Sequence, residues 1–249
     1  MKVSIITVSY NSASTIEDTI RSVVSQTYSD IEYIIIDGAS KDRTSEIVQS
    51  YQSGVSVFIS EKDKGIYDAM NKGVALAKGD IIGILNSDDF YADENVINDV
   101  VQKMQDSGAD VLYADLDYVD QQDTKKIVRR WKAGAYREGI FKQGWMPPHP
   151  TFFIKREAYE KFGTYNLSLR SAADYELMLR MLHKHKLRVT YLSRTIIHMR
   201  TGGQSNVTLK NRIKANMEDR LAWKMNDLKP GWYTLTWKPL RKLGQFLGR

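Results

Sequence analysis

The chain has 249 residues, of which 42% are hydrophobic, and this length is enough to bury one substantial core. It has no cysteine, which excludes disulfides, thiolate metal sites and cysteine nucleophiles. The formal net charge of +6 is uneven, because residues 200–249 hold eleven Lys and Arg against three acidic residues and the remainder is slightly acidic. This distribution argues against a nucleic-acid-binding body and indicates an anionic surface as the partner of the basic tail.

The N-terminus enters an apolar run of strand length at once, without the apolar region or the cleavage site of a signal peptide. No stretch approaches the roughly 20 apolar residues that span a bilayer. These features predict a cytoplasmic protein that is soluble or bound peripherally to the cytoplasmic face of the inner membrane.

Strand and helix patterns alternate through residues 1–115. Apolar runs predict strands at 3–8, 31–37, 55–60, 81–85 and 111–114. Helical periodicity lies between them, and the first helix begins at a capping box of Ser14 and Glu17. Further helices are predicted at 43–51 and 66–77, the latter ending near Gly79 as its C-cap. This alternation predicts an α/β protein with a mostly parallel, doubly wound sheet, in which ligands bind at the carboxyl ends of the strands.

The pattern loosens after residue 115. We expect an edge strand at 126–131, a proline-rich loop at 144–150, helices at 156–162 and 174–184, and a strand at 189–198. A polar helix is predicted at 209–225, and residues 230–249 mix aromatic with basic side chains. This last segment suits either an amphipathic segment in a membrane interface or a helix packed on the enzyme or on a partner subunit.

A polar cluster follows each of the first four predicted strands. The clusters are Ser9-Tyr10-Asn11, Asp37-Gly38-Ala39-Ser40, Glu61-Lys62-Asp63 and Asn86-Ser87-Asp88-Asp89. A single acidic cluster is usually a solvated turn, but four of them at one edge of a parallel sheet predict a site. The fourth suits Mg²⁺ or Mn²⁺, because these ions bind through one or two carboxylates together with substrate phosphates. The alternative for that cluster is an acidic turn or a helix N-cap.

Four motifs occur in order and at characteristic spacing. They are Thr7-Val8-Ser9-Tyr10-Asn11, Asp37-Gly38-Ala39-Ser40-Lys41-Asp42, Asn71-Lys72-Gly73 with Ala77-Lys78-Gly79-Asp80, and Leu85-Asn86-Ser87-Asp88-Asp89. Together they resemble family 2 glycosyltransferases of the GT-A fold, inverting enzymes that build bacterial polysaccharides, and in particular the capsule and exopolysaccharide branch with its colanic-acid-type transferases. The resemblance covers about residues 1–205. It implies a nucleotide-sugar-binding half at 1–115, an acceptor and catalytic half at 116–205, and a helical basic-aromatic segment at 206–249.

The resemblance also implies the donor pocket. The nucleoside would be lined by Tyr10, Asn11, Asp37 and Asp63. Asn71 and Lys72 would reach the donor from a helix, although Lys72 suits a solvated helix face equally well.

The implied metal site departs from the family pattern in one position. The family has Asp-x-Asp, whereas this chain has Asn86 before Asp88, so Asp88 is the expected main ligand of Mn²⁺ or Mg²⁺. Asp89 would bind sugar hydroxyls, and Ser87 belongs to the donor-binding set. His198 matches the C-terminal histidine that completes the metal shell, the alternative being an ordinary strand-end histidine. With one charge missing, we expect weak metal affinity in the absence of donor.

Residues of the second half are expected to do the chemistry. An acceptor hydroxyl needs a base to take its proton, and Asp174 matches the family's base, the alternative being a carboxylate that faces the helix dipole. Ala173 stands where the family often has Glu. Arg200 would clamp the diphosphate within a closing segment that reaches Ser205. His149 matches a loop near the donor sugar and acceptor, or else is a rigid-turn residue between prolines.

These features predict a metal-dependent inverting glycosyltransferase that uses a nucleotide sugar, UDP being the family's commonest carrier, and a glycan or lipid-linked acceptor. A sugar-nucleotide nucleotidyltransferase would need a glycine-rich basic loop after the first strand, where this chain has Ser9-Tyr10-Asn11-Ser12. A dinucleotide-dependent dehydrogenase lacks its glycine fingerprint at the same place. A non-catalytic carbohydrate-binding module stays open as the second class.

Overall fold

The computed structural model describes residues 1–202, 209–231, 233 and 234. The strands are β1 (Val3–Ser9), β2 (Ile31–Asp37), β3 (Val57–Ser60), β4 (Ile81–Ile84), β5 (Asp89–Tyr91), β6 (Val111–Val119), β7 (Ile127–Trp131), β8 (Phe153–Lys155) and β9 (Val189–Arg200). The α-helices are α1 (Ile16–Val24), α2 (Thr44–Ser50), α3 (Ile66–Leu76), α4 (Val96–Ser107), α5 (Arg156–Phe162), α6 (Ala173–Met178) and α7 (Leu209–Met225). Shorter helical turns are η1 (Ile140–Gln143) and η2 (His149–Thr151), and a π-helical segment, η3 (Leu179–Lys184), continues α6.

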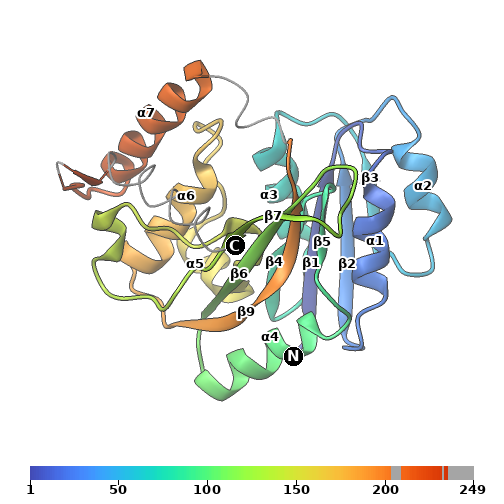
Figure 1. Ribbon diagram of the computed structural model, residues 1–249, viewed down its shortest axis with the longest axis horizontal. Coiled ribbons are helices and arrows are strands. Elements are labelled where there is room, and N and C mark those ends of the chain that lie inside the picture. The colour runs from blue at the N-terminus through green and yellow to red at the C-terminus, as the bar shows by residue number, and fades with distance from the viewer. Residues whose placement is uncertain (203–208, 232, 235–249) are drawn as a thin grey trace.

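The strands form one sheet in the order β3-β2-β1-β4-β8-β6-β9-β5, with β7 paired to the side of β6 (Figure 1). The pairs among β1 to β4 are parallel, as the sequence predicts. The second half is mixed, because β8 runs antiparallel between β4 and β6, and β5 runs antiparallel to β9. Both β8 and β5 have only three residues, too few for a hydrophobic pattern to reveal them in the sequence.

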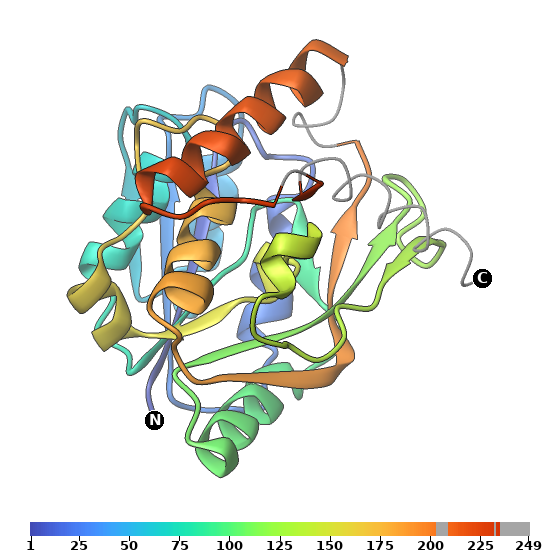
Figure 2. The same ribbon diagram turned by 90° about the vertical axis from the view of Figure 1, so that its left-hand side faces the viewer.

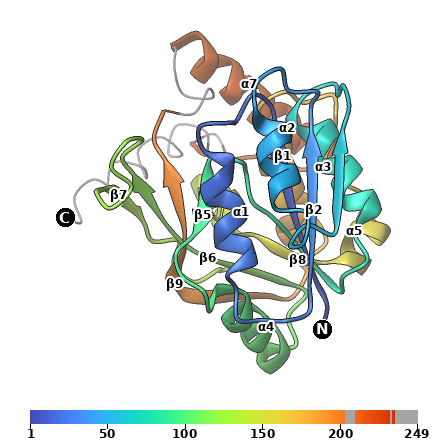
Figure 3. The ribbon, with the colours of Figure 1, turned by 90° about the vertical axis from the view of Figure 1, so that its right-hand side faces the viewer.

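Helices cover both faces of the sheet. Alternate residues of β1 point to opposite faces, so that Ile6 and Val8 join one core while Val3 and Ile5 join the other. The first core lies against α3, α5, α6 and α7, and the second against α1, α2 and α4. Figure 3 shows α1 and α2 in front of the parallel strands, and Figure 2 shows α7 crossing above α6 on the other side. This arrangement leaves the carboxyl ends of the parallel strands free of helices.

Two local predictions about helix ends are wrong. The first helix begins after Thr15, whose N–H and that of Ile16 donate to the Ser12 carbonyl, and no side chain caps it. Glu17 instead accepts hydrogen bonds from Arg21 and Tyr51, so the capping box does not form. The hydrogen bonds of Glu17 to Arg21 and Tyr51 therefore replace the capping bond that the Ser14–Glu17 spacing predicts.

Gly79 is not a C-cap, because α3 ends at Ala77 in an extended conformation. The glycine is needed two residues later for close approach: a Cβ on Gly79 would lie 2.5 Å from the Ser4 backbone nitrogen. Its N–H donates to Ser4 Oγ at 2.8 Å. The residue thus lets the connection into β4 pack directly on the start of β1.

The other elements of the second half match the predictions closely. The edge strand, the helix at 156–162 and the helix at 209–225 are β7, α5 and α7. Within the described part of the chain, no helix is both long enough and apolar enough to cross a membrane. The aromatic and basic residues expected at 235–249 lie outside the described residues.

Candidate active site

The polar clusters after the parallel strands do converge on one rim. The Asn11 N–H donates to Ser40 Oγ at 2.7 Å, and Asn11 Oδ1 accepts from the Lys41 N–H at 2.8 Å, which ties the end of β1 to the end of β2. Ser12 and Ser87 are joined through their hydroxyls at 2.8 Å, which brings in the end of β4. Asn11 and Ala39 adopt positive φ of 49° and 60°, a conformation that non-glycine residues rarely take outside constrained functional loops.

The buried Asp37 carboxylate holds the segments of this rim together through hydrogen bonds. Its side chain has no exposed surface, and its oxygens accept hydrogen bonds from Ser9 Oγ, Ser40 N–H, Ser40 Oγ and Ser60 Oγ. These bonds hold the ends of β1, β2 and β3 in fixed relation. The carboxylate is therefore occupied by the protein, and the nucleoside contact that the sequence suggests for it stays a prediction.

Tyr10 and Asp63 are the side chains that the rim leaves available. The Tyr10 ring is 60% exposed, and Asp63, which accepts from the Gly65 N–H at 2.8 Å, is partly exposed. Both lie over Gly38, where an added Cβ would come within 2.5 Å of Asp63 Oδ2 and 3.4 Å of the Tyr10 ring. An exposed aromatic face beside a carboxylate is a surface on which a nucleoside base can stack.

Asn71 and Lys72 are both engaged with the protein. Asn71 Nδ2 donates to the Tyr165 carbonyl at 2.8 Å, and Asn71 Oδ1 accepts from the Tyr165 N–H at 2.9 Å. Lys72 Nζ lies 2.6 Å from Glu61 Oε1 and donates to the Lys62 carbonyl at 3.0 Å. Asn71 thus fastens α3 to the second half of the chain, and Lys72 fastens it to the loop after β3.

The loop after β4 carries oxygens that lack partners. Asn86 Oδ1 and Asp89 Oδ1 are buried without a hydrogen bond from any described residue, while Asn86 Nδ2 donates to Asp89 Oδ2 at 3.2 Å. Burial raises the pKa of Asp88, although the nearby Arg200 and His149 partly offset this effect. Burial and the charge of Asp88 raise the pKa of Asp89 well above 3.8. Uncompensated oxygens of this kind fit a bound Mg²⁺ or Mn²⁺.

These oxygens do not form a complete metal cage by themselves. No three His, Asp or Glu side chains in the described part of the chain are grouped so as to hold a metal ion. His198 lies opposite Phe90 in the β5–β9 pairing, with ring centroids 5.3 Å apart, and its Nδ1 is buried without a partner among the described residues. Burial lowers the pKa of His198, which favours the neutral form that ligates metals.

Arg200 supports the Asn86–Asp89 loop from within the protein. Its side chain is 6% exposed, and its guanidinium donates to the Asp88 carbonyl at 2.8 Å and to the Asp18 carboxylate of α1. It also lies over the Phe90 ring at 5.0 Å. Arg200 therefore anchors the backbone of the loop in this conformation, whereas Ser205, expected to act with it, lies outside the described residues.

Asp174 lies where the two halves of the chain meet. It is in the first turn of α6, its side chain is 19% exposed, and its Oδ1 accepts from the Tyr67 hydroxyl of α3 at 3.1 Å. His149 Nδ1 lies 3.6 Å from Asp174 Oδ2, and His149 is also near enough to Asp88 to lower its pKa. His149 therefore lies beside the expected base, and its role at the donor sugar and acceptor stays a prediction.

Comparison with known proteins identifies the family. A model of the glycosyl transferase family 2 domain matches residues 4–165. The chain belongs to glycosyltransferase family 2.

Curated relatives of this family 2 glycosyltransferase are also glycosyltransferases. An uncharacterized glycosyltransferase of Mycobacterium tuberculosis (strain CDC 1551 / Oshkosh) is 32% identical over 186 residues, which cover 72% of this chain and 68% of the relative. The PGL/p-HBAD biosynthesis glycosyltransferase of Mycobacterium bovis (strain BCG / Pasteur 1173P2) is 29% identical over 210 residues, which cover 82% and 78%.

Solved structures share the GT-A-like fold of this family 2 glycosyltransferase. S. aureus TarS 1–349 in complex with UDP-GlcNAc has a TM-score of 0.69 at 17% identity, over 99% of this chain and 72% of that one. The mannosyltransferase PcManGT from Pyrobaculum calidifontis, in complex with GDP-Man and Mn²⁺, has a TM-score of 0.68 at 18% identity, over 95% and 68%. The chain spans 43% of a longer TarS structure. At such identities these likenesses establish the fold.

The second part of one of the four motifs of this family 2 glycosyltransferase lies away from the site. Asp80 accepts from the Lys2 N–H at 2.9 Å, and the Lys78 N–H donates to the buried Glu32 at 2.7 Å. These bonds are at the amino ends of β1, β2 and β4, opposite the polar rim. Residues 77–80 of the motif are therefore structural.

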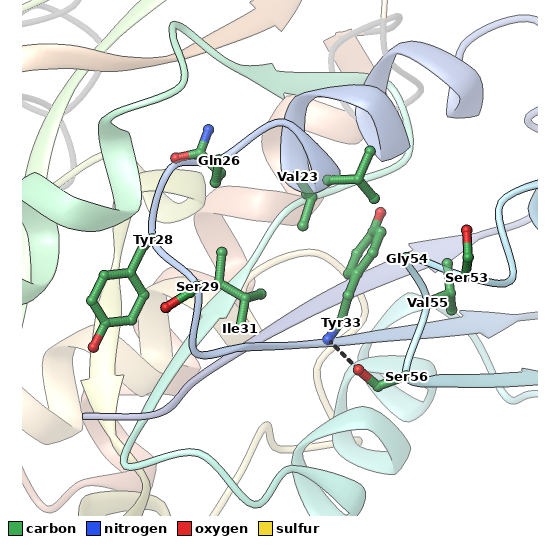
Figure 4. Close-up of a pocket in the computed structure, with 11 residues that line it drawn as sticks. Val23, Gln26, Tyr28, Ser29, Ile31, Tyr33, Ser53, Gly54, Val55 and Ser56 are labelled. Carbon is green, nitrogen blue, oxygen red and sulfur yellow. Dashed lines mark hydrogen bonds between the residues drawn. The ribbon is translucent and has the colours of Figure 1, made fainter.

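A hollow of about 340 Å³ is also at this opposite edge. It is lined by residues at the end of α1 and before β2 and β3, including Val23, Tyr28 and Ser56, and Figure 4 shows the Tyr33 N–H donating to Ser56 across its floor. None of the expected donor or base residues lines it, so it is separate from the site described above.

Two residues of this family 2 glycosyltransferase that contact the expected site residues are not predicted from the sequence. Tyr67 orients Asp174, and Asp18 holds Arg200. Tyr67 is in the first turn of α3, at the carboxyl edge of the sheet, and that position is the signal that points to it. The pairing of Asp18 with Arg200 joins residues 182 apart in the sequence and has no local signal.

Proposed function

We propose that this glycosyltransferase is an inverting, metal-dependent enzyme that moves a sugar from a UDP-sugar to a saccharide or lipid-linked saccharide in surface polysaccharide biosynthesis, within the capsule and exopolysaccharide branch. One observation carries the proposal: His149 Nδ1 lies 3.6 Å from Asp174 Oδ2, and the same histidine is near enough to Asp88 to lower the pKa of that carboxyl. A base next to the donor loop is the arrangement that direct displacement requires. The UDP-GlcNAc bound to TarS and the Mn²⁺ bound to PcManGT support the choice of donor and metal.

The donor would lie along the polar rim. The nucleoside would stack on the exposed Tyr10 ring beside Asp63, above the turn that Asp37 and Asn11 hold in place. The diphosphate would point toward the Asn86–Asp89 loop, where Ser87 is already tied to Ser12. Lys72 would contact the donor only by leaving Glu61, and Asn71 only by releasing Tyr165.

The metal would be held by Asp88 together with the unpartnered Asn86 Oδ1, with His198 as the further ligand of the family pattern, while Asp89 would bind sugar hydroxyls. When bound, it would supply positive charge to the diphosphate that leaves. Because Asn86 is neutral, the site would depend on the substrate phosphates for part of its charge. Arg200 would contribute by fixing the carbonyl of Asp88 and hence the course of the loop.

Asp174 would act as the base in a single displacement. The acceptor oxygen forms its bond to the anomeric carbon as the bond to the diphosphate breaks, and the hydroxyl proton passes to Asp174. Tyr67 donates to Oδ1, which leaves Oδ2 on the side of His149 to receive that proton. Attack from the side opposite the leaving group inverts the anomeric configuration.

We also propose that the C-terminal segment contacts the cytoplasmic face of the inner membrane, where a lipid-linked acceptor would be presented. On α7, Met217, Leu221 and Met225 are 66%, 39% and 37% exposed at a spacing of four residues, so they form one outward stripe. The exposed Arg220 and Lys224 flank this stripe. A bilayer with anionic lipids matches both its apolar and its basic character. In this proposal residues 1–205 form the catalytic domain, with halves at 1–115 and 116–205, and residues 206–249 the accessory segment.

The test is turnover of nucleotide sugars. UDP-, GDP- and dTDP-sugars are incubated with the wild type and with Asp174→Asn, with and without Mn²⁺, and the released nucleoside diphosphate is measured. We expect hydrolysis of one donor class that depends on Mn²⁺, and at least a 100-fold lower rate for Asp174→Asn with unchanged donor affinity. Asp30→Asn, at the opposite edge of the sheet, is the matched control. Absence of Mn²⁺-dependent turnover with every donor contradicts the proposal, and full turnover by Asp174→Asn moves the base elsewhere.

A further inference from the structure

The helix that carries Asp174 has no cap of its own. Helix α6 has six residues, its N-cap is Ala172, and no side chain of the preceding turn bonds to its free N–H groups. A short helix with an alanine at this position is poorly fixed by local interactions. Because Asp174 is in the first turn, fraying there would displace its carboxylate. Some other part of the molecule must hold the start of α6.

Helix α7 supplies the missing contacts before Asp174. Glu218 Oε2 accepts three hydrogen bonds from the approach to α6: the Ser171 N–H at 2.7 Å, the Ser171 hydroxyl at 2.9 Å and the Arg170 N–H at 3.1 Å. These bonds to a charged acceptor are stronger than neutral ones. Glu218 thus fixes the two residues that lead into the Ala172 N-cap, and through them the position at which α6 begins.

The same helix, together with the residue that directly follows it, holds α6 just after Asp174. Trp223 Nε1 donates to the Tyr175 hydroxyl at 2.9 Å, and Asn226 Nδ2 donates to Glu176 Oε1 at 2.8 Å. Trp223 and Asn226 are buried, with 0% and 2% exposure, so these bonds are shielded from water. Figure 2 shows α7 lying across α6 in this way. Residues on both sides of Asp174 are therefore bound to α7.

We propose that Glu218 is a positioning residue for sugar transfer, which acts by fixing the first turn of α6 and so the Asp174 carboxylate against Tyr67 and His149. This inference rests on the proposed role of Asp174 as base. Loss of the Glu218 contacts leaves the donor rim untouched, because that rim is built from β1 to β4. The defect belongs in kcat and not in the KM for the donor, since a small misplacement of a catalytic group lowers the rate of the chemical step.

The test compares Glu218→Ala, Glu218→Gln and the control Asn216→Ala, an exposed residue of the same helix. Steady-state hydrolysis of the donor is measured with hydrogen exchange of the segment 168–176. For Glu218→Ala we expect a kcat about tenfold lower, a donor KM within twofold of the wild type, and faster exchange. Glu218→Gln retains a carbonyl acceptor and restores kcat to within threefold of the wild type, and Asn216→Ala behaves as the wild type.

Asp174→Asn, measured alongside, separates this inference from the proposed function. If Asp174→Asn loses turnover while Glu218→Ala keeps the wild-type kcat, the role of Glu218 is wrong and the base assignment stands. A donor KM that rises in step with the fall in kcat, or a Glu218→Gln variant no better than Glu218→Ala, also overturns it. If Asp174→Asn keeps full turnover, the proposed base fails first, and the inference fails with it.

Discussion

Asp89 is a buried carboxylate whose surroundings do not favour its charged form. It has no exposed surface, its Oδ1 lacks a partner among the described residues, and Asp88 is its neighbour. Burial and that neighbouring charge raise its pKa well above 3.8. A group with a raised pKa stabilises the fold only while it is protonated, so its contribution falls as pH rises through the pKa of the folded state. Above that pKa the ionised carboxylate destabilises the fold, because its Oδ1 lacks a partner among the described residues.

Asp89→Asn should therefore raise the melting temperature at pH 7 by about 2–4 °C, the change expected for ~1 kcal/mol in a protein of this size. The gain should shrink as the pH is lowered toward 4, because the wild-type carboxyl is then protonated too. Affinity for the donor with Mn²⁺ should fall at least tenfold. Melting curves from pH 4 to 8 and nucleotide titrations check both effects. A gain in melting temperature that does not change with pH would show that ionisation is not its cause.

At the scale of elements, α7 faces two partners. Ala222 and Trp223 are buried against the core that includes α6, while Met217, Leu221 and Met225 point outward. Because apolar residues lie on both the inward and the outward face of α7, the sequence shows no single apolar face there and predicts only a polar helix. The inward face packs on α6, which carries the proposed base, and the outward stripe is exposed, as the proposed membrane contact requires.

The double variant Met217→Glu and Leu221→Glu should weaken binding to vesicles that contain anionic phospholipid by at least tenfold, because it removes apolar contact and adds repulsion. Sedimentation with vesicles of anionic and of purely zwitterionic lipid, at low and high salt, measures this. Ile127→Glu, on the exposed edge strand β7, is the control and should bind as the wild type. Equal sedimentation of the wild type with both kinds of vesicle, or of the double variant with the wild type, would refute a role for the stripe.

At the scale of the whole molecule, the proposed donor site joins loops from four strands to the proposed base on a helix of the other half. Asn71 links α3 to the Tyr165 backbone, and Tyr67 links α3 to Asp174. Both links join residues about a hundred positions apart in the sequence. A ligand that binds at the polar rim should therefore stabilise both halves of the chain together and raise one common melting temperature.

Mn²⁺ alone and UDP alone should each shift the melting temperature by less than about 1 °C, whereas the two together should raise it by about 5–11 °C at 100 times the dissociation constant. The reason is that Asn86 is neutral where the family pattern has a carboxylate, so the proposed metal site needs the negative charge of the bound diphosphate. Thermal melts with each ligand and with the pair measure this coupling. Asp174→Asn, which keeps the rim intact, should show the same shift. A full shift with Mn²⁺ alone would contradict the account of an incomplete metal site.

Sequence alone determined the parallel half of the sheet, the rim of polar clusters and the family. Buried strands such as β2 are continuous apolar runs, and the motifs at Asn11 and Asp88 are contiguous, so local signals reveal both. Tertiary structure decided which of those residues are free to act. Asp37 and Arg200 have the chemistry of ligand-binding groups, but partners from other elements occupy them. The reach of Glu218 to Ser171 likewise depends on the docking of α7, which arises from packing between elements distant in the chain and leaves no pattern in either segment.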